Sequence, residues 1–528
     1  MNGAESLTRT LVQQGVELCF ANPGTSEMHF VAALDKVEGM RCVLGLFEGV
    51  VTAAADGYYR MADKPACTLL HLGPGLGNGL ANMHNAKKAG SGMVNIVGEH
   101  ATYHIEHNAP LTSDIEGVAR PMSHWVQTCH DSTQVARAGA DAVTAALQPP
   151  GQIATLILPA DTAWNPGGEV VAKRPRPTRE PVAGVAVEAC AQALRKGRKT
   201  ALLLGDIAGR EVALQWAGRI AAHCQADVLC EYSVARLERG AGRVTPKRVP
   251  YSVDLAVKML AEYEQIILVA ARPPVAFFAY PGKPSMLAAP GCQFVTLAES
   301  HQDVNGALEA LADALGARAT APAQRADLQR PALPGPGRDP IEPVGLGRLI
   351  AALIPEGAVV VDESVSSGRG FDLPTGQAAP HCWLNIMGGA IGFGLPGSVG
   401  AAIGAPDRPV IVLEGDGSGM YTLQALWTMA RESLNIKVVV LANRSYNILQ
   451  GELKNVGAAS PGVNARAMLT LDRPDLDWVH LARGMGVPGQ RAESLQELAT
   501  ALQRALATPG PMLIEAVVGP TVLPPDRP

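Results

Sequence analysis

Short aliphatic runs alternate along this chain with amphipathic helical stretches, and this alternation limits the folds that the chain can adopt. Seven of the runs are rich in Val, Ile and Leu and carry few polar side chains, as strands buried on both faces do. They lie at residues 67–72, 152–159, 200–205, 265–270, 358–363, 409–415 and 436–443. Strands separated by helices pair in parallel. The pattern therefore predicts an α/β protein built from doubly wound parallel sheets.

Two segments break the alternation and divide the chain into three parts. Residues 165–181 and 319–343 lose periodicity and gather Pro, Gly and charge, which is typical of linkers. A chain of 528 residues also exceeds what one hydrophobic core supports. We therefore expect three domains, at residues 1–164, 182–318 and 343–528.

Composition argues against several classes of function. No apolar run approaches the roughly 18 residues that suggest a membrane-spanning helix, and the polar start of the chain lacks the apolar core of a signal peptide. The nine cysteines form no CxxC pair, which favours reduced thiols. A formal net charge of -5 gives no basic field for nucleic acid. We expect a cytoplasmic protein that acts on a small molecule and has no membrane or nucleic-acid partner.

A strand–helix–strand unit at residues 409–443 carries the clearest site. The first strand ends at Gly415-Asp416-Gly417, a helix is predicted over residues 418–431, and the second strand ends at Asn443. Parallel strands finish at one sheet edge, so Asp416 and Asn443 can face a single point. Their oxygens suit Mg²⁺, while the glycines and the helix N-terminus suit a phosphate. The unit predicts a Mg²⁺-diphosphate cradle; an exposed turn with an unrelated Asn is the alternative.

This unit resembles the cofactor motif of thiamine-diphosphate-dependent enzymes. The resemblance extends over nearly the whole chain, toward the benzoylformate decarboxylase and acetolactate synthase branch. It implies a pyrimidine-binding domain, a central Rossmann-like domain and a diphosphate-binding domain, in that order. It also implies Mg²⁺ ligands at Asp416, Asn443 and the carbonyl of Ser445, and a set of coenzyme-binding residues: Ser366, Gly389, Ile391, Asp416, Gly417, Ser418, Asn443 and Tyr446.

Two members of this set have particular roles in the family. Ile391 stands where a bulky apolar residue wedges the coenzyme into a bent shape, and simple core packing is the alternative for it. Gly389 stands where a backbone carbonyl meets the aminopyrimidine amine. One departure is Val365, which replaces a frequent Thr and so removes a hydroxyl that could contact the diphosphate.

A second candidate lies far away in sequence, where Glu48 is the lone charge in an apolar run at residues 43–55. A carboxyl in such a setting is costly unless it has a partner. It can share a proton with a nitrogen of a bound ring. The run resembles the family segment whose glutamate activates the coenzyme, which implies that Glu48 is catalytic. The alternative is a helix-start residue that faces solvent.

Thr25 and His71 resemble the substrate side of benzoylformate decarboxylases. Thr25 stands where those enzymes hold the substrate carboxylate with Ser, and His71 stands where they have an active-site His, suited to proton transfer. A hydrogen-bonded strand-end histidine is the alternative for His71. The Gly-Pro-Gly at residues 73–75 instead resembles acetolactate synthases, and Tyr280 replaces a second pocket His.

Other functional classes have weaker support. The run GPGLGNG at residues 73–79 prompts a nicotinamide-dependent oxidoreductase, but Asn78 stands where the third glycine of the fingerprint belongs. The central domain shows no such fingerprint, so we expect it to have a structural role. A catalytically silent relative could keep the cradle, yet it would not need Glu48.

The resemblance implies a thiamine-diphosphate- and Mg²⁺-dependent enzyme that decarboxylates a 2-oxo acid. We expect the C2 carbanion of the coenzyme to attack the 2-oxo carbonyl and an enamine to form as CO₂ leaves. Protonation then gives an aldehyde, as in a decarboxylase, whereas capture by a second carbonyl gives a carboligase of the acetolactate synthase type. The sequence leaves both outcomes open and leans toward the decarboxylase. In the family the glutamate and the cradle come from different subunits, so a homodimer or homotetramer is implied.

Overall fold

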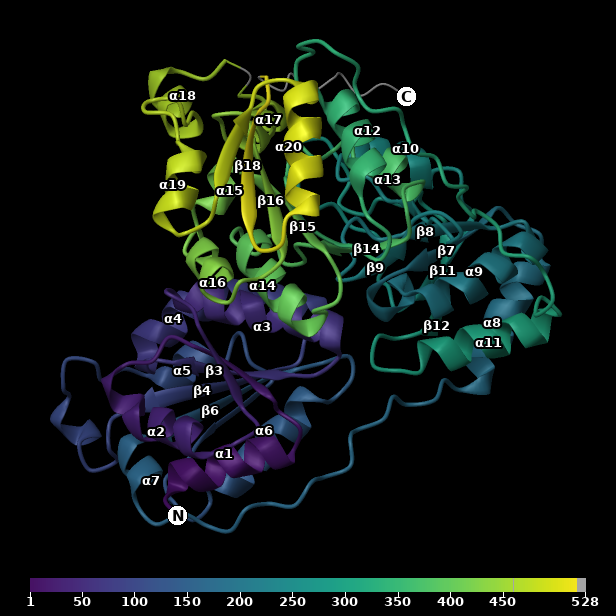
Figure 1. Cartoon of the computed structure of the whole chain (residues 1–528). Helices are drawn as coiled ribbons and strands as arrows, with labels where there is room; N and C mark the ends of the chain where they lie inside the picture. The colour runs from purple at the N-terminus through teal and green to yellow at the C-terminus, as the bar shows by residue number, and fades with distance from the viewer. Residues whose placement is uncertain (459, 520–528) are drawn as a thin grey trace.

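Three sheets follow one another along the chain and are covered by helices (Figure 1). The computed structural model describes residues 1–458 and 460–519. The first sheet has the order β2-β1-β3-β4-β6-β5, and all of its strands are parallel. The strands are β1 (Leu18–Ala21), β2 (Arg41–Leu44), β3 (Ala66–Leu70), β4 (Met93–Glu99), β5 (Trp125–Thr128) and β6 (Ile153–Pro159). Helices α1 (Gly3–Gln13) and α6 (Val135–Ala146) pack on one face of it, and α3 (Glu48–Ala62) and α4 (Leu72–Ala89) pack on the other.

The central sheet is also parallel and has the order β10-β8-β7-β11-β12. Its strands are β7 (Thr200–Leu204), β8 (Asp227–Cys230), β10 (Lys247–Arg248), β11 (Gln265–Val269) and β12 (Gln293–Ala298). The covering helices include α8 (Gly184–Arg195), α9 (Glu211–Cys224) and α11 (Val304–Leu315) on one face and α10 (Val253–Leu260) on the other.

The third sheet has the order β17-β18-β16-β15-β13-β14-β9. Six of its strands are parallel: β13 (Val359–Glu363), β14 (His381–Asn385), β15 (Val410–Gly415), β16 (Ile436–Ala442), β17 (Gly489–Ala492) and β18 (Met512–Val517). The edge strand β9 (Leu237–Arg239) comes from the central segment and pairs antiparallel with β14. The central and third domains therefore share backbone hydrogen bonds.

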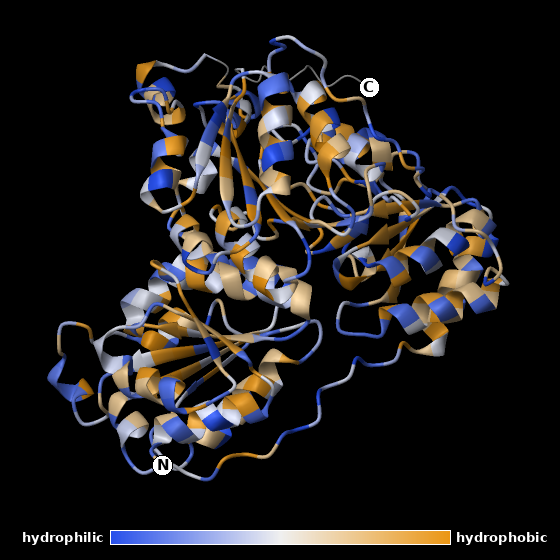
Figure 2. Ribbon diagram, viewed as in Figure 1, coloured by the Kyte–Doolittle hydropathy of each residue, from blue (hydrophilic) through white to orange (hydrophobic). Residues whose placement is uncertain are grey.

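The predicted fold class is confirmed, since all seven predicted strands form and their ends shift by two residues or fewer. Their apolar residues explain this agreement, because five of the seven, including β3, β7 and β11, are buried along their whole length. Figure 2 shows the same pattern, with hydrophobic strands inside all three domains and hydrophilic residues along the outer helices. The first predicted linker contains no helix or named strand. The second contains none before its last residue, Pro343, where α12 (Pro343–Leu353) begins. The exact domain ranges stay a prediction.

The structure corrects one local prediction. The helix predicted over residues 418–431 is divided into α15 (Asp416–Gly419) and α16 (Ala425–Arg431). Between them Thr422 donates its hydroxyl to the Gly392 carbonyl at 3.1 Å, and the backbone makes i→i+3 bonds in place of helical ones. The run GPGLGNG, which the sequence already made a poor nicotinamide fingerprint, lies inside α4. No helix among the described residues is long and apolar enough to span a bilayer.

Helix α3 lies between the first and third sheets, against α14 (Gly394–Gly404) (Figure 1). The two backbones approach closely because glycines face each other. A Cβ at Gly57 would lie 1.9 Å from the Gly397 carbonyl oxygen, and one at Gly400 would lie 1.8 Å from the Ala54 oxygen. One continuous apolar core then extends from the first sheet through both helices to the third. The contact fixes how the first and third domains sit relative to each other.

We expect Gly57→Ala to lower the free energy of unfolding by about 2 kcal/mol or more, because the added methyl forces the helices apart. Gly77→Ala is the matched control within a helix. It has nothing within 4 Å of the new Cβ, and it should be neutral or stabilise by about 0.5–1 kcal/mol. Urea unfolding at equal protein concentration measures both. Equal stability of the two variants would contradict the close-packing interpretation.

Candidate active site

The carboxyl ends of β13, β15 and β16 bring together the residues predicted to form the cradle. Asp416 is the first residue of α15 and is only 4% exposed. Its Oδ1 accepts the N–H of Gly417 at 2.9 Å, and its Oδ2 accepts the N–H of Arg444 at 2.6 Å. The second bond ties the end of β15 to the loop after β16. Asp416 and Asn443 therefore lie at neighbouring strand ends, as the sequence predicted.

Asn443 connects the same edge to the loop after β13. Its Nδ2 donates to Ser367 Oγ at 3.3 Å, and its Oδ1 accepts the N–H of Ser445 at 2.9 Å. Ser366, next to Ser367, is 7% exposed. Among the predicted coenzyme residues, Ser366 and Tyr446 lie in the loops after β13 and β16, and Ser418 lies in α15 after β15.

Gly417 needs to be glycine for a packing reason. A Cβ there would lie 2.5 Å from the Tyr446 ring and 3.0 Å from Leu471. Tyr446 thus closes over the backbone of the Gly-Asp-Gly turn. The backbone of this turn can approach an anion only because a side chain is absent.

The donors at this edge fit a hard divalent cation. One carboxylate, one amide oxygen and a backbone carbonyl are the few protein ligands with which Mg²⁺ binds phosphate oxygens. The described residues include no cluster of three or more His, Cys, Asp or Glu that could hold a metal, so any ion here depends on amide and carbonyl oxygens. Burial raises the pKa of Asp416 to about 6, and the backbone N–H bonds offset this only in part. A bound cation would stabilise the ionised form.

The segment with Gly389 and Ile391 is held by a carboxylate that the sequence reasoning missed. Glu363, the last residue of β13, accepts the N–H of Gly392 at 2.8 Å and of Gly394 at 2.6 Å. Gly389 and Gly392 have φ values of 72° and 107°, which favour glycine. The signal in the sequence was a Glu at the end of a buried strand. Its partners lie about 30 residues away, so the role needed the structure.

Helix α4 reaches this segment from the first domain. Asn85 Nδ2 donates to the Ala390 carbonyl at 2.7 Å, and Asn85 Oδ1 accepts the N–H of Gly388 at 3.1 Å. Asn82 donates to the Gly392 carbonyl at 3.1 Å. Two asparagines of one domain therefore position the backbone on either side of Ile391 in another. The sequence analysis assigned neither of them.

Glu48 begins α3 and is 8% exposed, so it does not face solvent. Asn78 Nδ2 donates to its Oε2 at 3.0 Å. The residue that breaks the nicotinamide fingerprint therefore holds the carboxylate. Gly75 leaves room for the other oxygen, since a Cβ there would lie 2.9 Å from Glu48 Oε1 and 3.2 Å from His71 Cβ. Glu48 and His71 thus border the same small space.

His71 follows β3 and pairs with Glu27, which the sequence analysis also missed. His71 Nδ1 lies 2.9 Å from Glu27 Oε2, and Glu27 is 4% exposed. Glu27 also accepts the N–H of Gly24 at 2.8 Å and the hydroxyl of Ser26 at 2.6 Å. Among the described residues, His71 Nε2 has no hydrogen-bond partner. Thr25 lies in the same turn with an exposed side chain.

The predicted residues therefore form two groups. Thr25, Glu48 and His71 follow the adjacent strands β1, β2 and β3, whereas the coenzyme residues follow β13, β14, β15 and β16. Within the described residues of one chain, no hydrogen bond or ion pair joins Glu48 to Ser366, Asp416 or Asn443. The assigned roles stay predictions.

Family models match both groups. Residues 1–133 match the thiamine pyrophosphate enzyme N-terminal TPP binding domain, and residues 373–516 match the C-terminal one. The chain belongs to the thiamine pyrophosphate enzymes. Its cofactor is thiamine diphosphate, as the motif predicted, and Mg²⁺ is the usual partner of that coenzyme in this family.

Relatives of this thiamine pyrophosphate enzyme align over nearly its whole length. The "Putative acetolactate synthase large subunit IlvX" of Mycobacterium tuberculosis is 49% identical and covers 98% of this chain and 99% of its own. A benzoylformate decarboxylase of Pseudomonas aeruginosa is 30% identical, with 96% of both chains covered. A solved structure of a 4-hydroxybenzoylformate decarboxylase from Rhodococcus jostii has a TM-score of 0.84 and 25% identity, covering 98% of this chain and 99% of its own. The predicted branch is thereby confirmed.

We expect Asp416→Ala to weaken Mg²⁺-dependent thiamine diphosphate binding by about 100-fold or more, since even second-shell changes at metal sites cost 10–100-fold. Asp407→Ala is the control. It removes an exposed carboxylate of the same domain and should bind like the wild type. Fluorescence titration with the coenzyme, with and without Mg²⁺, measures both. Wild-type affinity in the Asp416 variant would exclude the cradle.

Proposed function

We propose that this thiamine pyrophosphate enzyme decarboxylates a 2-oxo acid to an aldehyde, with carboligation as a side activity. The His71–Glu27 pair beside Glu48 is the observation that carries the proposal. A decarboxylase must return a proton to the carbon that loses CO₂. An imidazole can both accept and donate a proton, and one ring nitrogen of His71 is fixed by a buried carboxylate. The free Nε2 is the proton donor that this chemistry needs.

The bound coenzyme supplies an electron sink for the pair released when CO₂ leaves. The residues of the chain prepare that event. Glu48, fixed by Asn78 and almost fully buried, would share a proton with a ring nitrogen of the coenzyme. Gly389 would offer its carbonyl to the ring amine, and Ile391 would pack against the coenzyme. Asp416, Asn443 and the Ser445 carbonyl would hold Mg²⁺, while Ser366, Gly417, Ser418 and Tyr446 would border the diphosphate.

The wall above Gly389 favours a substrate with an apolar or aromatic group. A Cβ at Gly389 would lie 2.9 Å from Phe277 Cζ. Phe277 and Phe278 are 50% and 53% exposed and pack edge to face with centroids 5.0 Å apart. The Tyr280 side chain, at the position of the second pocket His, interacts with Glu452 and Tyr251. Phenylalanine side chains at the entrance of an active site can contact the apolar part of a ligand.

A carboligase of the acetolactate synthase type is the second candidate. The relative with 49% identity carries that name, and the Gly-Pro-Gly after His71 agrees with it. The two outcomes differ in whether His71 or a second carbonyl compound reaches the reacting carbon first. Thr25, exposed in the turn beside His71, would meet the substrate carboxylate in either case.

We infer a homodimer or homotetramer with active sites between subunits. Support comes from Glu48, which is held by Asn78 but, among the residues described, makes no hydrogen bond or ion pair with the cradle residues of its own chain. A second subunit would complete the site. All nine cysteines are free, which agrees with the proposed cytoplasmic location.

Glu48→Gln should bind thiamine diphosphate with wild-type affinity and slow exchange of its C2 proton by about 100-fold or more, because the amide cannot share a proton with the ring. Glu38→Gln changes an exposed carboxylate of the same domain and is the control. Hydrogen–deuterium exchange followed by NMR gives the rate. Unchanged exchange in Glu48→Gln would remove this residue from the mechanism.

Product analysis tests the proposed function. The holoenzyme is incubated with pyruvate, benzoylformate and longer 2-oxo acids, with and without an aldehyde acceptor, and products are identified by mass spectrometry. We expect aldehyde and CO₂ as the main products, and a fall of about 100-fold or more in their rate in His71→Ala. His107→Ala, at an exposed surface histidine, should leave the rate unchanged. A hydroxy-keto acid as the main product, insensitive to His71, would favour the carboligase.

A further inference from the structure

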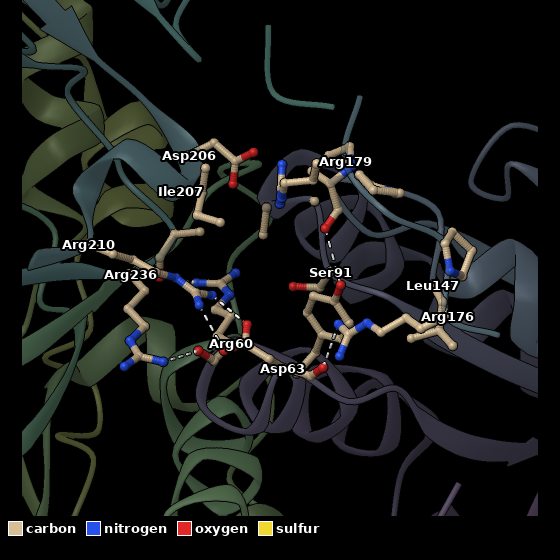
Figure 3. A pocket seen from close by; sticks show the side chains of 17 residues that line it. Arg60, Asp63, Ser91, Leu147, Arg176, Arg179, Asp206, Ile207, Arg210 and Arg236 are labelled. Atoms are coloured by element: carbon tan, nitrogen blue, oxygen red, sulfur yellow. Dashed lines mark hydrogen bonds and ion pairs between the residues drawn. The ribbon is translucent and has the colours of Figure 1, made fainter. Parts of the chain in front are cut away.

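A cavity of about 300 Å³ lies where the first domain, the first linker and the central domain meet. This volume is at the lower end of small-molecule pockets. Its walls come from the last turn of α3, the end of α4, the linker and the turn η3 (Asp206–Gly209) (Figure 3). Five arginines line it: Arg60, Arg176, Arg179, Arg210 and Arg236. None of the residues assigned to the coenzyme or the substrate contributes to its walls.

Three of the five arginines form ion pairs with carboxylates of the protein itself. Their closest N–O distances are 2.5 to 2.6 Å, for Arg60 with Asp56, Arg210 with Asp63 and Arg236 with Glu238. Arg60 is the most buried, with its side chain 1% exposed, and it also donates to the Asn385 carbonyl at 2.6 Å. This hydrogen bond connects α3 to the third domain.

The other two arginines have no carboxylate partner among the described residues. Arg176 donates to the backbone carbonyl of Asp63 at 2.9 Å, and Arg179 donates to the backbone carbonyl of Ser300. A guanidinium has five N–H donors, so most of theirs are unused. On the neighbouring wall, Arg236 Nε is buried and finds no acceptor in residues 1–458 and 460–519. Figure 3 shows Arg176 and Arg210 on opposite sides of the hollow, with Arg179 at its rim.

Asp206 is the remaining carboxylate of the lining and faces Arg179 across the rim (Figure 3). Its Oδ2 is buried and has no hydrogen-bond partner within the described part of the chain. Burial raises its pKa to about 6, although Arg179 and Arg210 act in the opposite direction. Asp206 is therefore a poorly satisfied counter-charge. It would compete with an external anion for Arg179.

We propose that this cavity is a binding site for a small dianion of the phosphate type, held by Arg176 and Arg179. The planar fork of a guanidinium matches two phosphate oxygens, and the interaction strengthens where water is partly excluded. Because Arg176 and Arg179 belong to the linker, the anion would tie the linker to the first and central domains. The site does not depend on the reaction proposed above.

Calorimetric titration of inorganic phosphate into the holoenzyme tests the site. Saturating thiamine diphosphate and Mg²⁺ keep the cradle occupied, and chloride holds the ionic strength constant. We expect Arg176→Ala and Arg179→Ala to weaken phosphate binding at least tenfold each. Lys173→Ala removes one positive charge from the same linker, at an exposed position outside the cavity, and should change the affinity less than twofold.

Asp206→Asn distinguishes this site from a general effect of charge or folding, because it should increase affinity. The amide removes the internal competitor while keeping its size, and Asn tolerates the φ of 41° at this position. We expect phosphate to bind at least threefold more tightly to this variant at pH 7.5. No phosphate heat in the wild type, equal affinity in all the arginine and aspartate variants, or tighter binding of malonate than of phosphate would overturn the proposal.

Discussion

The close packing of α3 on α14 is the constraint on which the rest of the structure depends. It needs glycines, because a Cβ at Gly57 or Gly400 would overlap a backbone carbonyl of the facing helix. Each end of α3 then has a separate task. Its first residue, Glu48, lies in the proposed active site. Its last turn supplies Arg60 and lines the cavity that contains the five arginines. A shift of this helix would therefore disturb both sites at once.

Two buried carboxyl groups lie at the edge of the third sheet. Glu363 and Glu414 lie side by side in the parallel register of β13 and β15, and both are almost fully buried. Burial raises the pKa of Glu363 to about 7 and that of Glu414 well above its usual range. The N–H groups of Gly392 and Gly394 favour the ionised form of Glu363. Among the described residues, Glu414 Oε2 has no hydrogen-bond partner, so burial disfavours the ionised form of Glu414 more than that of Glu363.

The features that depend on periodicity or on strand order could be predicted from the sequence. Runs of aliphatic residues placed the strands, and parallel strands imply a common edge, so Asp416 and Asn443 could be brought together before the structure was known. Glu363, Glu27 and Asn85 could not, because each acts through a hydrogen bond to a distant loop. The interrupted helix after Gly417 was also missed. Its break depends on a contact between Thr422 and Gly392, residues 30 positions apart.

Missing side chains shape the proposed catalytic pocket as much as the ones that are present. A Cβ at Gly24 would lie 2.1 Å from His71 Nδ1, and one at Gly98 would lie 1.7 Å from Glu27 Oε1. A Cβ at Gly75 would press on Glu48. Each of these glycines therefore leaves the space in which one polar side chain takes its position. This space comes from three separate elements: the turn at Gly24, strand β4 at Gly98 and helix α4 at Gly75. The imidazole and the two carboxylates can therefore approach one another only in the folded domain, where hydrogen bonds compensate for their desolvation.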